Sequence, residues 1–132
     1  VQAFFAKLSE GPRAAAEQKY LSQHVTLGGL QYSRATGWLI FGKPAALSGR
    51  ITNDGDRVID GITVGLYFVD GQGRIRSGGE VLLTEIVRPQ ESISFRVTSK
   101  QAGFAFPDDA GSLKRIYQLV DLHFYAPPKK GE

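Results

Sequence analysis

The sequence of 132 residues predicts a single all-β domain, an antiparallel β-sandwich that follows an N-terminal helical arm. Three observations predict this fold class. Apolar and polar residues alternate with a period of two in several runs after residue 44, as they do in half-buried strands. Turn-forming segments separate these runs about every ten residues. No segment between the runs is long enough to be a crossover helix, which argues against a parallel α/β sheet.

Residues 1–23 are expected to form the helical arm or linker. The arm has an apolar cluster near its start, a Gly-Pro interruption at residues 11–12, and a stretch of strong helix formers over residues 13–21. It is therefore interpreted as one helix or two short helices, or as a stalk that leads out of a membrane, and one segment can serve as both. The side chains expected to pack on the sandwich are Phe4, Phe5, Leu8, Tyr20 and Leu21.

Residues 24–126 are expected to form the sandwich. A short, irregular strand over Val25–Tyr32 comes first, and two glycines interrupt it. The alternating runs follow over residues 47–52, 62–69, 92–97 and 116–125, and each one places one face in the core and one in water. In the last run, one face is expected to carry Ile116, Gln118, Val120, Leu122 and Phe124.

Turn chemistry and aromatic residues complete the predicted fold. The segments Asn53–Asp56 and Asp70–Gly73 are typical of tight turns, because glycine adopts the positive φ angles that hairpins need. Residues 127–132 are expected to be a frayed tail. The aromatic residues expected to fill the core are Trp38, Phe41, Phe68 and Phe95.

Charge and composition exclude several classes of function. Lysine and arginine total 16 and aspartate and glutamate total 13, and the basic surplus lies within residues 1–44. This basic third is interpreted as solvated charge or as a contact with anionic lipid. The rest of the chain is neutral and carries aspartates among its hairpins, so no nucleic-acid partner is expected. The absence of cysteine excludes disulfides, thiol nucleophiles and thiolate metal sites.

No pattern of residues indicates catalysis. The two histidines, His24 and His123, are far apart in the sequence, and neither an HxH nor an HExxH pattern is present. No nucleophile elbow and no phosphate-binding loop occurs. The sequence therefore predicts no catalytic, cofactor-binding or metal-binding residues, no cofactor and no enzyme. A hydrolase with a minimal site would need a cleft that contains His123 or an acid with a shifted pKa.

Two loops have alternative interpretations. Asp54, Asp56 and Asp60 offer the clustered carboxylates that calcium prefers, whereas a hairpin turn that bonds its own backbone explains the same residues. Further along the chain, Phe104 and Phe106 precede a proline. These two phenylalanines are expected either to plug the open end of the sandwich or to form an apolar patch that contacts a protein partner.

Residues 45–97 resemble a known family. Leu47–Gly55 is similar to the G-x-V-x-N-x-G opening of FxLyD-type domains. Ile62–Ile75 is similar to the strand and turn that follow in that family, and its Asp70 keeps the aspartate of the naming motif. Pro89–Phe95 is similar to the P-G-x-x-x-x-F stretch of the same family.

This resemblance implies an immunoglobulin-like sandwich of about seven strands from a bacterial membrane-anchored family of unknown function. Members of that family are expected to have a membrane helix, a short linker similar to Ala16–Tyr20, and then this domain. The sequence begins without methionine, so Val1 is expected to lie inside a longer gene product or to follow processing, and the resemblance implies a membrane segment upstream of Val1.

The expected function is therefore a non-enzymatic protein-interaction or scaffold module of a membrane-tethered bacterial envelope protein, with the domain outside the cytoplasm. The alternative is a sandwich that binds calcium or a small ligand with the Asp54–Asp60 loop.

Overall fold

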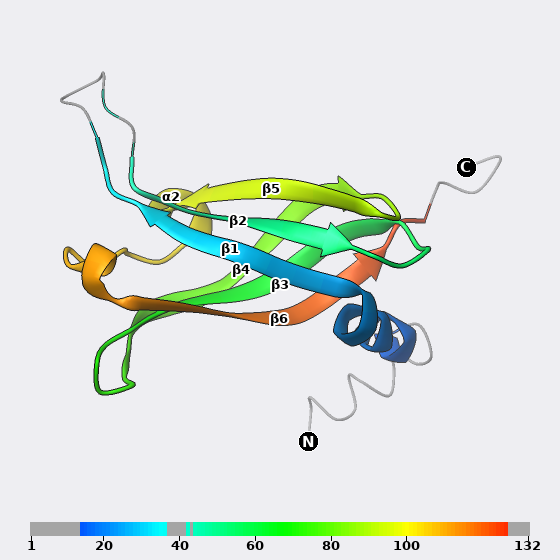
Figure 1. The fold of residues 1–132 in the computed structure, drawn as a ribbon, viewed down its shortest axis with the longest axis horizontal. Helices are drawn as coiled ribbons and strands as arrows, with labels where there is room; N and C mark the ends of the chain where they lie inside the picture. The colour runs from blue at the N-terminus through cyan, green and yellow to red at the C-terminus, as the bar shows by residue number, and fades with distance from the viewer. Residues whose placement is uncertain (1–13, 37–41, 43, 127–132) are drawn as a thin grey trace.

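Two three-stranded antiparallel sheets pack face to face in the computed structural model, which describes residues 14–36, 42 and 44–126 (Figure 1). One sheet has the strand order β1-β2-β5 and the other has the order β4-β3-β6. An all-β sandwich is thus confirmed, and the described part of the chain contributes these six strands. Their bounds are β1 (Val25–Ser33), β2 (Ala46–Asn53), β3 (Ile59–Val69), β4 (Ile75–Val87), β5 (Glu91–Thr98) and β6 (Lys114–Phe124).

Short helical segments lie at the ends of the sandwich. Residues 14–24 are helical and lead directly into β1, and the short elements α2 (Ser99–Ala102) and η2 (Ala110–Ser112) lie between β5 and β6. Tyr20 and Leu21 are buried, so this helix docks through two of the side chains predicted for it. The other three, Phe4, Phe5 and Leu8, and the predicted tail at residues 127–132 lie outside the described residues. Within the described ranges no helix is long and apolar enough to cross a membrane.

The core lies between the two sheets and draws on both of them. The strand β3 contributes four fully buried side chains at alternate positions, from Ile62 to Phe68, because it lies in the centre of its sheet. On the opposite sheet, Leu47, Ile51 and Phe95 face them. Phe68 and Phe95 therefore fill the core as predicted, whereas Trp38 and Phe41 lie outside the described residues.

The strand β6 departs from the predicted alternation. Thr63 of β3 pairs with Asp121, but the next residue, Val64, pairs with Leu119, so Val120 is an extra residue in the ladder. Such a bulge moves every side chain before it to the opposite face. Leu122 and Phe124 are buried as expected. The prediction is wrong for Ile116, Gln118 and Val120, because Ile116 and Gln118 are exposed and Leu119 packs against the core in place of Val120.

Candidate functional site

The outer face of the β1-β2-β5 sheet is polar and basic. Its register aligns Thr26 with Thr52 and Ser92, and Gly28 with Arg50 and Ser94. The exposed and half-buried residues on this face include two arginines and no acidic side chain. They are Thr26, Gly28, Gln31, Ser33, Ser48, Arg50, Thr52, Ser92, Ser94, Arg96 and Thr98.

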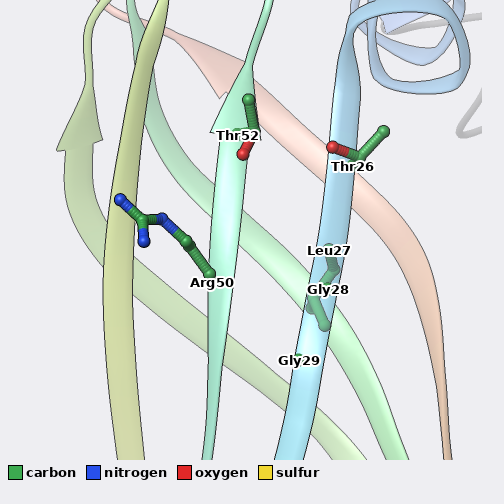
Figure 2. A pocket seen from close by; sticks show the side chains of 6 residues that line it. All are labelled: Thr26, Leu27, Gly28, Gly29, Arg50 and Thr52. Atoms are coloured by element: carbon green, nitrogen blue, oxygen red, sulfur yellow. The ribbon is translucent and has the colours of Figure 1, made fainter.

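A shallow hollow of about 340 Å³ lies on this face, between β1 and β2 (Figure 2). The register of β1 shifts between Gly28 and Gln31, and a side chain at either Gly28 or Gly29 would meet no atom within 4 Å. Arg50 and Thr52 line the hollow from β2, and in Figure 2 the Arg50 guanidinium extends toward β5 rather than over the glycines. The lining offers hydrogen-bond donors from threonine and arginine, which bind polar groups and do not transfer protons at neutral pH.

The outer face of the β4-β3-β6 sheet is different, because large apolar side chains lie on it. Leu82 and Ile86 of β4 are 59% and 42% exposed, and Ile116 of β6 is 38% exposed. Their partners on β3 are Thr63, Asp60 and Tyr67 respectively. These four apolar residues, Leu82, Ile86, Ile116 and Tyr67, are called the apolar face below.

Two glycines make room for Tyr67 on the apolar face. A side chain on Gly78 would lie 2.4 Å from Cδ1 of the Tyr67 ring, and one on Gly65 would lie 2.8 Å from its hydroxyl oxygen. The ring therefore occupies the space that side chains at both of these positions would need.

The two histidines lie at the end of the molecule where the helix of residues 14–24 docks, and each has its own carboxylate. His24 Nδ1 lies 3.0 Å from Asp54 Oδ1, and His123 Nδ1 lies 3.6 Å from Glu17 Oε2. Neither histidine lines the hollow on the β1-β2-β5 sheet. The two contacts join the helix to β6 and to the turn after β2, which is a structural role.

The three aspartates considered for calcium do not converge. Asp54 is paired with His24, and Asp60 lies on the outer face of β3 opposite Ile86. Over the described ranges, no three histidine or acidic side chains are close enough together to hold a metal ion. The loop is instead organised by Asn53, whose Oδ1 accepts a hydrogen bond from the Gly55 N–H at 3.1 Å, as in an Asx turn.

The two phenylalanines predicted to contact a partner are partly buried at one end of the sandwich. The Phe106 ring meets Phe68 with a centroid distance of 5.4 Å and Tyr32 with a distance of 6.1 Å. Phe104 packs against Phe106 at 5.7 Å. Both residues therefore act as a plug of the core, which was one of their two predicted roles, and their contact with a partner stays a prediction.

No known protein family, curated protein or solved structure matches the chain. The resemblance to FxLyD-type domains therefore stays a prediction. The structure itself defines the class of protein as an all-β sandwich with one polar outer face and one outer face on which large apolar side chains are exposed. The residues that sequence reasoning missed are those of the apolar face, and the adjacent leucines Leu82 and Leu83 were the signal for it, since one of two neighbours on a strand must point outward.

Proposed function

We propose that the chain is a non-enzymatic protein-interaction or scaffold module of a membrane-tethered bacterial envelope protein. The apolar face is the observation that carries this proposal. An antiparallel sheet with one solvated face normally places polar residues there. Three large aliphatic side chains, exposed by 38% to 59%, lie on this face, with Ile116 beside Tyr67 and with Leu82 and Ile86 further along β4. Grouped exposed apolar residues of this kind mark a surface that binds a partner.

The sheet order supports an immunoglobulin-like assignment. In that fold the strands A, B and E share one sheet, the strands C and F share the other, and C′ is added beside C. The order β1-β2-β5 matches A, B and E, and the order β4-β3-β6 matches C′, C and F. A seventh strand, equivalent to G, would pair with the outer edge of β6.

The experiment is a cross-linked capture from an envelope extract, with three forms of the chain as bait. The forms are the wild type, the double variant Leu82→Ser with Ile86→Ser, and the control Arg50→Ala on the opposite, polar face. We expect one protein to be retained by the wild type and the control and lost from the double variant. An empty capture, or equal retention by all three forms, contradicts the proposal.

The membrane tether is tested separately, on the protein as cells produce it. Cells are lysed and fractionated, and the domain is detected with an antibody. We expect the domain in the membrane pellet, resistant to a high-salt wash and released by detergent, and digested by protease added to spheroplasts. Recovery in the soluble fraction, or protection from the external protease, contradicts this part of the proposal.

A further inference from the structure

The outer edge of β6 is the strongest feature that the proposed function leaves unused. At a sheet edge, alternate residues present unpaired N–H and C=O groups, which form a template for another strand. One half of this edge is already occupied by side chains of the helix. Gln18 Nε2 donates to the Val120 carbonyl at 2.9 Å, and the Phe124 N–H donates to Glu17 Oε2 at 2.8 Å. These two side chains stand where a neighbouring strand would make its hydrogen bonds.

The other half of the edge, residues 114–119, has no neighbouring strand among the described residues (Figure 1). Tyr117 pairs with Leu66 of β3 and so shares the inner face with it. Leu66 is fully buried, whereas Tyr117 is 44% exposed. The inner face of the sandwich is therefore left uncovered at this point of β6. Ile116, which points to the outer face, is 38% exposed.

Edge strands in monomeric proteins carry devices that prevent pairing, and two other edges of this molecule have them. The strand β1 has a bulge at Gly29, whose φ is +64°. The strand β4 has an extra residue where its register against β3 shifts between Asp60 and Ile62, and the loop after α2 lies against its inner face, where Phe104 packs beside Gly79. In β6 the bulge and the helix protect only the half from Val120 onward.

We infer that residues 114–119 of β6 bind an extended segment of a protein partner by β-strand addition, at the place that strand G takes in an immunoglobulin-like fold. This inference goes beyond the proposed function, because it assigns a second binding site that is separate from Leu82 and Ile86. Only an extended polypeptide satisfies a row of alternating N–H and C=O groups. Its alternate side chains would cover Tyr117 on one face and Ile116 on the other.

Basic residues at one end of the segment 114–119 indicate which chemical group the bound peptide segment carries. Lys114 and Arg115 begin the strand, and neither one has a carboxylate partner among the described residues. The Arg115 Nη1 donates to the Leu113 carbonyl, but its buried Nε has no acceptor among those residues. An acidic side chain or a C-terminal carboxylate on the incoming strand would pair with this basic end. The helix at Val120 closes the other end, so the bound segment is about six residues long.

The test uses a phage-displayed library of random twelve-residue peptides, selected on the immobilised chain. Enriched peptides are synthesised, and their binding is measured by fluorescence anisotropy and by amide hydrogen exchange. We expect alternating apolar residues followed by an acidic residue, and slower exchange at residues 114–119. The variant Tyr117→Lys should weaken binding about fivefold or more. The matched control is Tyr125→Lys, since Tyr125 is 42% exposed against 44% for Tyr117, and it should bind within about twofold of the wild type.

Three outcomes overturn the inference: no enrichment over the display background, equal binding to Tyr117→Lys, or protection that lies away from β6. A dimer of the purified chain in analytical ultracentrifugation that Tyr117→Lys dissolves would also overturn it, because a second copy would then be the occupant. If Tyr117→Lys does not fold, Tyr117→Ser is compared with Tyr125→Ser in the same assay. The capture described above separates the two proposals, since it depends on Leu82 and Ile86 of β4 and not on the edge of β6.

Discussion

Asn53 is fully buried, and all four of its hydrogen-bonding positions are used. Its Oδ1 accepts from the Tyr20 hydroxyl at 2.6 Å and from the Gly55 N–H at 3.1 Å. Its Nδ2 donates to the carbonyls of Arg57 at 2.7 Å and Val87 at 3.2 Å. One side chain therefore joins the N-terminal helix, the turn after β2 and the end of β4, and a buried amide is stable only when it is satisfied in this way.

The variant Asn53→Ala is expected to lower the free energy of unfolding by about 2–4 kcal/mol, because several buried groups lose their partner at once. The control Tyr20→Phe removes only the hydroxyl of that network and should cost about 1–2 kcal/mol. Urea denaturation followed by circular dichroism measures both values. A cost for Asn53→Ala no larger than about 0.5 kcal/mol, as for a surface substitution, would contradict this role.

Gly49 and Gly55, which lie in the segment that resembles FxLyD-type domains, are both explained by packing in this chain. A side chain on Gly55 would lie 2.3 Å from the Tyr20 hydroxyl, and one on Gly49 would lie 2.9 Å from the Phe95 ring. Glycine is needed at both places because an aromatic ring occupies the space. The sequence shows these residues but not their pairing, since Tyr20 and Gly55 meet only through the docking of the helix.

Asp70 organises the turn between β3 and β4, and its pKa is held below the ordinary value. The Arg74 N–H is the largest cause, and the Gln72 N–H and the Arg74 side chain also donate to the carboxylate. A depressed pKa in the folded state means that the ionised carboxylate stabilises the fold above the unfolded pKa. This contribution is lost as the pH falls through the folded pKa.

We therefore expect the Asp70 carboxyl to titrate below about 3.9, the value for an unperturbed aspartate, in a carbon-detected NMR titration. The variant Asp70→Asn should remove this titration and reduce the loss of thermal stability between neutral and acidic pH. A midpoint at or above the unperturbed value would show that the turn does not hold the ionised form.

At the scale of elements, the helix of residues 14–24 is held to the sandwich by polar contacts as well as by apolar ones. Glu17 is 4% exposed, and its carboxylate accepts the Phe124 N–H at the outer edge of β6. Gln18 bonds to the same strand, and Tyr20 and Leu21 are buried beside it. The helix is thus part of the folded unit, and it closes one half of an edge that would otherwise be open.

Glu17→Ala is expected to lower the free energy of unfolding by about 1–3 kcal/mol, because the Phe124 N–H is left without its acceptor. Amide hydrogen exchange should accelerate at Phe124 and in the helix, and much less at β3 in the centre of the sheet. Glu17→Gln keeps an acceptor oxygen and should lose less. Unchanged exchange at Phe124 in Glu17→Ala would show that the contact does not stabilise the docked helix.

The strands differ in how well the sequence predicts them. The alternation in β2, β3 and β5 identifies their inner faces, because their pairing is regular or nearly so where they cross the core. In β6 the predicted alternation is wrong for the residues before Val120, because the bulge arises from the pairing with β3 and cannot be read from the local sequence. In β4, Leu82 and Ile86 point outward and interrupt the alternation of apolar and polar residues. The strand is therefore difficult to recognise from the sequence.

At the scale of the whole molecule, the apolar face predicts that binding of the partner and stability of the fold depend on different residues. Leu66 and Leu82 lie on neighbouring strands, but Leu66 is fully buried whereas Leu82 is 59% exposed. The same truncation to alanine should therefore have opposite consequences. Leu66→Ala is expected to cost about 2–5 kcal/mol of stability, because it leaves a cavity in the core.

Leu82→Ala is expected to change stability by less than about 0.5 kcal/mol, since more than half of the residue is already exposed to water, and yet to weaken capture of the partner. Urea denaturation and the cross-linked capture, performed on both variants, measure the two effects. A residue whose truncation leaves the stability unchanged but weakens binding contributes to binding and not to folding. If Leu82→Ala is instead as destabilising as Leu66→Ala, the apolar face packs against another part of this chain and is not free for a partner.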